Sequence, residues 1–154
     1  MASTLTVDNI VGATTADNVH IPGAVIQVKN TNTNTRTTHS STSYQVADDI
    51  VATITPKYAT SKILVMMNVM ARTFNGAGAD SSIKVGFSRD GGSTIISPIR
   101  TRAYDYGSNG IIVESSLSAN FLDSPATTSS LTYQVYFAYV NGNNATVNNF
   151  SPDP

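Results

Sequence analysis

Two histidines, His20 and His39, are the first candidates for chemistry in this sequence. Neither stands in an H-x-E or H-E-x-x-H spacing, so no pair of metal ligands with a general base beside it is predicted. Three copies of His20 around a symmetry axis would be one way to hold an ion, but exposed or interface histidines are the more ordinary interpretation. The abundant serines include no G-x-S-x-G motif, and the chain has no cysteine thiolate to act as a nucleophile.

Carboxylates are the other candidates for catalysis. Asp105, Glu114 and Asp123 could supply a pair of acids for glycoside cleavage, which requires two carboxyl groups about 5–10 Å apart. Any β protein with ten acidic residues offers such pairs, so surface and turn carboxylates are the favoured interpretation. We therefore predict a protein that is not an enzyme and that uses no metal or other cofactor.

One group of residue types favours a binding surface. Arg100, Arg102, Tyr104 and Tyr106 alternate along a predicted strand, so they share one of its faces. Arginine and tyrosine are enriched where a surface is buried against a partner, and tyrosine also stacks on sugar rings. The two interpretations left open are a partner-binding face and an ordinary outer face with long side chains.

The composition excludes several classes of partner and of fold. Charged residues make up 12% of the chain and the net charge is −1, which leaves no electrostatic footprint for nucleic acid or for an anionic membrane. Thr, Ser and Asn together make up about a third of the residues, and glutamate occurs once. Because the usual helix-forming surface residues are scarce, no substantial helix is expected.

No segment is predicted to enter a membrane. The N-terminus has neither the basic region nor the apolar region of a secretory signal. The longest apolar stretch, residues 63–71, is far shorter than the roughly 18–20 residues of a membrane-spanning helix. We expect a product that is made in the cytoplasm and is soluble.

Residues 1–22 differ from the rest of the chain, because their apolar residues stand singly and are too few to form a core. These residues are Leu5, Val7, Ile10, Val11, Val19 and Ile21. The segment is predicted to be an extended arm that is ordered only on a neighbouring chain. Pro22-Gly23 marks its junction with a domain over residues 23–154.

From residue 24 onward, short runs of period-2 alternation stand between turn residues, as in strands with one buried face. Predicted strands cover residues 24–29, 50–54, 63–74, 83–88, 111–122, 131–139 and 145–150, with one or two more in 93–106 and an edge strand or loop in 30–42. Residues 89–92 (RDGG) lack the spacing of a calcium loop and are predicted to form a hairpin turn. About eight strands at this spacing predict an all-β fold, an antiparallel β-sandwich of jelly-roll type.

The predicted strand over residues 63–74 is apolar on both faces. Its first face holds Ile63, Val65, Met67 and Val69, and its second face holds Leu64, Met66, Asn68 and Met70. Soluble monomers seldom expose an apolar stripe of this kind. We expect the second face to lie in the core under another sheet or to be covered by a sister subunit.

Four stretches of the sequence carry a family resemblance. They are residues 4–10 (TLTVDNI), 22–28 (PGAVIQV), 54–65 (ITPKYATSKILV) and 122–125 (LDSP). These stretches resemble short virion structural proteins of marine and cyanobacterial tailed phages, the fibre-like and capsid decoration proteins. The opening segment is similar to the start of tail-fibre shafts, and the remainder is similar to a small β domain of such proteins. The resemblance covers nearly the whole chain and implies no catalytic residue.

The resemblance implies a location on the virion surface, with capsid or tail proteins as partners. About twenty residues before the domain are too few for the shaft of a long fibre. This favours a compact capsid decoration or cement protein that docks on the major capsid protein as a homotrimer and strengthens contacts between capsomers. The alternative is a tail fibre or receptor-binding knob that contacts host surface polysaccharide.

Overall fold

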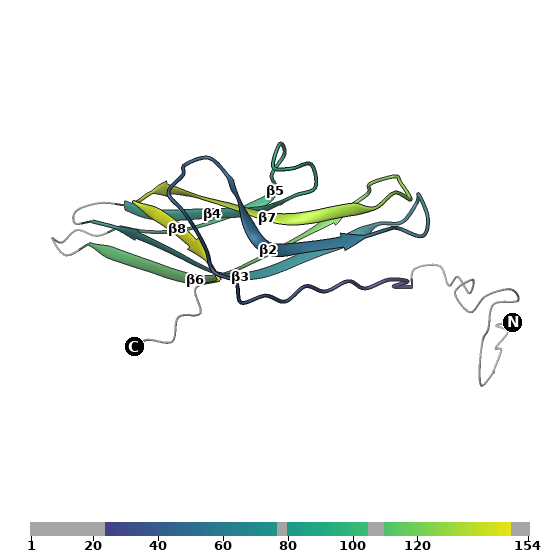
Figure 1. The fold of residues 1–154 in the computed structure, drawn as a ribbon, viewed down its shortest axis with the longest axis horizontal. Helices are drawn as coiled ribbons and strands as arrows, with labels where there is room; N and C mark the ends of the chain where they lie inside the picture. Colours follow the sequence, from purple (N-terminus) through teal and green to yellow (C-terminus); the bar gives the residue numbers. More distant parts are fainter. Residues whose placement is uncertain (1–23, 77–79, 105–109, 149–154) are drawn as a thin grey trace, which may run out of the picture.

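The computed structural model describes residues 24–76, 80–104 and 110–148, and these residues form eight β-strands and no helix. The strands are β1 (Thr37–His39), β2 (Gln45–Ile54), β3 (Ile63–Asn75), β4 (Asp80–Ser88), β5 (Ile96–Tyr104), β6 (Ile111–Asp123), β7 (Leu131–Asn141) and β8 (Asn144–Val147). They form two four-stranded sheets with the orders β1-β8-β3-β6 and β2-β7-β4-β5. Figure 1 shows the strands of both layers running close to the long axis of the molecule.

The strand order is that of a jelly roll. The chain folds back on itself so that β1 pairs with β8, β2 with β7, β3 with β6 and β4 with β5, and every pair is antiparallel. Successive pairs of this ribbon fall in opposite sheets, which is how a jelly roll forms its two layers. The predicted all-β sandwich of jelly-roll type is therefore confirmed.

The core lies between the two sheets. It is formed by the apolar residues that alternate with polar ones along the strands. Phe87 on β4 and Phe137 on β7 are its largest fully buried side chains. From the first face of β3, Met67 and Val69 are buried, and Val65 packs against the same cluster while half-buried. Each fully buried side chain of this size stabilises the fold by roughly 1.5–3 kcal/mol.

One predicted strand is absent from the structure, and two predicted regions are narrowed by it. Residues 24–29 form no strand, because the segment has no ladder partner, and β1 occupies only three residues of the 30–42 region. In the 93–106 region a single strand, β5, continues through Pro98. Proline is tolerated there because β5 is an edge strand and because its pairing with β4 is irregular beside Ser97, whose φ is 49°.

The predicted hairpin turn at residues 89–92 is confirmed, and the loop folds back over the outer face of its own sheet. Gly92 has a φ of +90°, and a Cβ atom there would lie 2.6 Å from Cε1 of the Tyr136 ring. A Cβ atom on Gly86 would likewise lie 2.5 Å from Cγ2 of Ile95. The two glycines therefore let the loop lie directly on β4 and β7.

Replacing Gly92 by alanine tests this close contact, and Gly91 provides a matched control. Gly91 also has a positive φ, +73°, but a Cβ atom there meets nothing within 4 Å. We expect Gly91→Ala to lower the free energy of unfolding by about 1–2 kcal/mol through backbone strain alone. Gly92→Ala is expected to lower it by at least about 1 kcal/mol more, because the Tyr136 ring has to move. Equal losses in urea unfolding would contradict the packing of the loop on Tyr136.

The same loop is held by the carboxylate of Asp90, which accepts hydrogen bonds from Ser88 Oγ at 2.7 Å and from the backbone N of Thr94 at 2.9 Å. These bonds lower the pKa of Asp90 from 3.8 to about 2. Because the pKa is lower in the folded state, the stabilisation is complete above about pH 4 and is lost as the pH falls towards about 2.

We therefore expect Asp90→Asn to unfold at a lower temperature than the wild type at pH 7. The difference between the two melting temperatures should shrink as the pH falls from about 4 to about 2, since the wild-type carboxylate is then protonated. Thermal unfolding followed by circular dichroism across this range measures the effect. A difference that stays constant with pH would show that the charge of Asp90 is not involved.

Candidate functional site

The site begins with an unpaired backbone edge on β3. β6 pairs with β3 along its whole length, but β8 pairs only with Ala71–Phe74. One further bond joins the backbone N of Asn148 to the carbonyl of Met70 at 2.8 Å. In an antiparallel strand the N–H and C=O groups of one residue point to the same side, and the side alternates from one residue to the next. Because the carbonyl of Met70 points towards β8, the N–H and C=O groups of Leu64, Met66 and Asn68 point towards the same edge. Within the described residues, no backbone hydrogen bond across the edge satisfies them.

An extended segment, residues 24–33, runs along this edge without pairing to it. Figure 1 shows the segment passing lengthwise beside β3. Its contacts are made by side chains: Thr31 Oγ1 donates to the carbonyl of Val51 at 2.6 Å, and Asn148 Nδ2 donates to the carbonyl of Thr33 at 3.4 Å. The segment thus connects β2 of one sheet to the end of β8 in the other.

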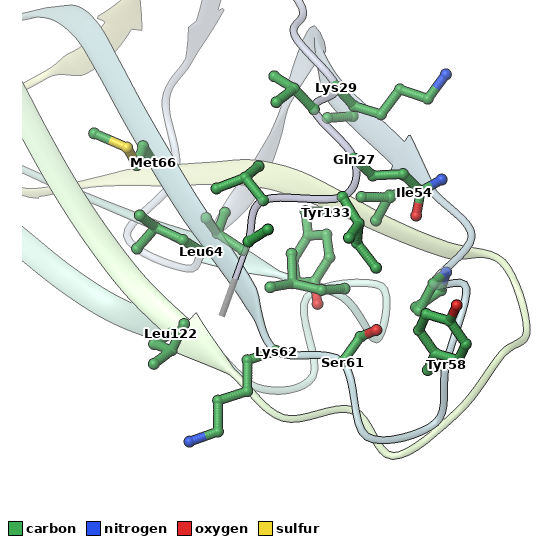
Figure 2. A pocket seen from close by; sticks show the side chains of 18 of the residues that line it. Gln27, Lys29, Ile54, Tyr58, Ser61, Lys62, Leu64, Met66, Leu122 and Tyr133 are labelled. Carbon is green, nitrogen blue, oxygen red and sulfur yellow. The ribbon is translucent and has the colours of Figure 1, made fainter. Parts of the chain in front are cut away.

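A groove with a volume of about 490 Å³ lies between this segment and the beginning of β3. We call it the edge groove. Its other walls are the end of β2, the loop after it around Tyr58, and Leu122 at the end of β6. Figure 2 shows Tyr133 on its floor, with Leu64 and Met66 on one side and Tyr58 on the other. A second hollow of about 320 Å³ shares Met66 and Tyr133 with it and continues along β3 towards the core.

Exposed apolar side chains gather around the edge groove. Nine large apolar residues are exposed in the described part of the chain, and six of them line this groove. The six are Val25, Val28, Tyr58, Leu64, Met66 and Leu122. Leu64, Met66 and Leu122 are 60%, 72% and 53% exposed, and Leu64 lies directly opposite Leu122 in the β3–β6 register. We call these three residues the apolar end.

The middle of the same sheet face is polar. Asn68 lies opposite Ser118 and accepts a hydrogen bond from Ser116 Oγ at 2.7 Å. Arg72 and Glu114 form an ion pair across the two strands, with Nε and Oε1 3.3 Å apart. The apolar end is therefore separated by polar side chains from Ile112 and Phe74, which lie opposite each other near the far end of the two strands.

The position of the apolar end corrects one expectation for β3. Leu64 and Met66 are not covered by another sheet, because the second sheet packs on the opposite face of β3, where Met67 and Val69 point. Only Met70 of the three predicted core or interface residues is half-buried. The expectation that Leu64 and Met66 lie in the core is thus wrong. That a sister subunit covers them stays a prediction.

A polar cluster around the buried carboxylate of Asp123 holds the floor of the groove. Tyr133 Oη donates to Oδ2 of Asp123 at 2.6 Å, and Nε of Arg89 lies 3.2 Å from the same oxygen. Asp123 is buried, and the three residues come from β7, the end of β6 and the turn after β4. Burial, with the hydrogen bond and the charge of Asp123, raises the pKa of Tyr133 well above its usual value. The cluster ties the two sheets together directly beneath the groove.

The predicted carboxylate pair is not brought together. Glu114 and Asp123 lie nine residues apart on β6, which corresponds to roughly 30 Å along a strand. Asp105 lies outside the described residues. Of the two histidines, His39 has Nε2 3.0 Å from the carbonyl of Val46 and its ring stacked at an angle near Phe137, while His20 also lies outside the described residues.

The predicted arginine and tyrosine face exists on the outer side of β5. Arg100, Arg102 and Tyr104 are exposed there, as alternation predicts. Both guanidinium groups bond within the chain: Arg100 Nε donates to Ser82 Oγ at 2.5 Å, and Arg102 Nε lies 2.9 Å from the carboxylate of Asp80. Tyr106 and the six apolar residues of the arm lie outside the described part of the chain.

Sequence reasoning missed the edge groove and the cluster beneath it. The groove depends on how far β8 extends along β3, and no local pattern encodes that length. Among residues 24–76, 80–104 and 110–148, no cluster of potential metal ligands is present. Over the same residues, no helix is long and apolar enough to cross a membrane. No protein-family model, curated protein or solved structure matches this chain.

The cluster beneath the groove makes a testable contribution to stability. We expect Asp123→Asn to lower the free energy of unfolding by about 2–3 kcal/mol, because Arg89 loses its buried partner, and Tyr133→Phe to lower it by about 1–2 kcal/mol. The control is Glu114→Gln, which breaks an exposed ion pair and should change stability by no more than about 1 kcal/mol. Urea unfolding at pH 7 measures all three. A loss in Asp123→Asn no larger than in Glu114→Gln would contradict a role for the cluster in joining the sheets.

Proposed function

We propose that this chain is a non-enzymatic structural protein of a tailed-phage virion, which self-associates as a trimer and docks on the particle surface as a capsid decoration protein. The observation that carries the proposal is the apolar end. Leu64, Met66 and Leu122 stand exposed beside the point where the N-terminal segment enters the sandwich. Exposed apolar clusters of this kind mark surfaces that are covered by another protein.

The composition of the remaining surface supports the same role. The face beyond the apolar end carries serine, asparagine and one ion pair across β3 and β6. With a net charge of −1, neighbouring copies would repel one another only weakly. A protein displayed in many adjacent copies requires both a surface that binds a neighbour and a charge low enough to allow close packing.

The location is tested by quantitative mass spectrometry of purified virions whose genome encodes the chain. A decoration protein is expected at hundreds of copies per particle, and particles from a deletion mutant should be less resistant to internal DNA pressure on heating. A copy number of a few tens would instead assign the chain to the tail, as a fibre or receptor-binding knob. Absence from purified virions would overturn the proposal.

Self-association is tested by placing a charge on the apolar end. Met66→Asp should leave the fold intact, because the side chain is exposed, and should raise the dissociation constant of the oligomer at least tenfold, about 1.4 kcal/mol. The matched control is Ile112→Asp. Ile112 is also exposed and lies on the same sheet face, near the start of β6 and far from the apolar end. Analytical ultracentrifugation gives both constants. Equal effects of the two substitutions would contradict a specific role for the apolar end.

A further inference from the structure

We propose that the edge groove receives the N-terminal arm of a second copy of this chain, with residues 4–7 (TLTV) added as a strand along the open edge of β3. The inference rests on the self-association proposed above and names the segment that mediates it. Four features support it: the unpaired backbone of β3, the apolar lining of the groove, the positive charge on the rim of the groove, and the length and attachment point of the arm.

The backbone of β3 is open on the side that faces the groove. Leu64 and Met66 present N–H and C=O groups to the edge groove, and Asn68 presents its groups to the hollow that continues it along β3. The described part of the chain gives these groups no backbone partner across the edge. An extended peptide that adds to a sheet edge satisfies alternate groups of this kind through main-chain hydrogen bonds. The edge groove therefore suits a strand better than it suits a helix or a compact ligand.

The side chains of residues 4–7 match the apolar lining of the groove. Leu5 and Val7 are two residues apart, so they point to the same side of an extended chain, with Thr4 and Thr6 on the other side. An added strand beside β3 would place Leu5 and Val7 against the apolar end. Residues 4–7 are also β-branched at three of four positions, which favours the extended conformation.

The arm and the groove carry charges of opposite sign. The arm, residues 1–23, contains Asp8 and Asp17 and has no lysine, arginine or glutamate. The residues that line the edge groove include Lys29 and Lys62 and no acidic residue. Figure 2 shows these two lysines at opposite ends of the groove. Asp8 follows Val7 directly, so a strand with Val7 in the groove would bring an aspartate to a rim that carries lysine.

The arm is long enough to reach a neighbouring copy, and its connection to residue 24 favours a second copy as the donor. Residues 24–29 form one wall of the groove, so the chain's own arm would have to turn back over that wall to reach β3. Sixteen residues lie between Val7 and Ala24, and the seventeen steps from one Cα atom to the next span up to about 60 Å in an extended chain. Each copy would donate its arm to one neighbour and accept an arm from another. Such a head-to-tail contact forms a closed trimer when the rotation between neighbouring copies is one third of a full turn about one axis, and an open filament otherwise.

Engineered disulfides test the proposal directly, because the chain has no cysteine of its own. We expect the double variant Val7→Cys/Met66→Cys to form covalent dimers and a closed trimer on mild oxidation, resolved on a non-reducing gel. The control pairs Val7→Cys with Ile112→Cys, which lies on the same sheet face but far from the groove. This control should yield at least tenfold less covalent oligomer. Circular dichroism of each variant checks that the β fold is intact.

Each other outcome overturns the proposal in a distinguishable way. A disulfide formed within one chain would show that the arm fills its own groove. An oligomer by ultracentrifugation without the Val7–Met66 disulfide would overturn the arm exchange and leave self-association standing. A monomer without the disulfide would overturn both the arm exchange and the self-association. Equal crosslinking of the Ile112 control would show that the arm does not bind specifically in the edge groove.

Discussion

The pairing of β3 with β6 is the interaction on which the rest of the structure depends. The two strands are thirteen residues each and pair without a register shift from Ile63 to Asn75. β8, which flanks β3 on its other side, is only four residues long. One side of β3 is therefore fully bonded and the other is mostly open, and this mismatch in length creates the unpaired edge and the groove beside it. The β3–β6 pairing itself brings Leu64 opposite Leu122 and so forms part of the apolar end.

The same mismatch explains why the N-terminal segment lies where it does. A sandwich with an open side exposes part of its core, and residues 24–33 reduce that exposure by spanning from β2 to the end of β8 through two side-chain hydrogen bonds. Side-chain contacts of this kind hold a segment less tightly than a ladder of backbone bonds. The open side is thus occupied but not sealed, which is the condition that a binding surface requires. Arg89, Asp123 and Tyr133 keep the two sheets joined beneath it.

The sequence was sufficient to predict the sandwich because alternation is a local signal. The two faces of β3, the long strand β6 and the exposed arginines of β5 all follow from period-2 patterning within single strands. Residues 24–29 carry the same pattern and yet form no strand, because a strand also requires a partner of the right length at the right distance. The Asp123 cluster was missed for a related reason: its members come from two strands and a turn, and only the folded topology brings them together.

The pairing of β1 with β8 has a consequence for the order of events during synthesis. Thr37 lies opposite Val147, so the first strand cannot be fixed until residues more than a hundred positions later have left the ribosome. Contacts this distant in sequence form late, because a long loop has to close before they are gained. The strands β2 to β7 can pair beforehand. Residues 24–33 depend in part on the same late segment, because Asn148 donates to the carbonyl of Thr33. This wall of the groove is therefore complete only after β8 and the residue that follows it have been synthesised.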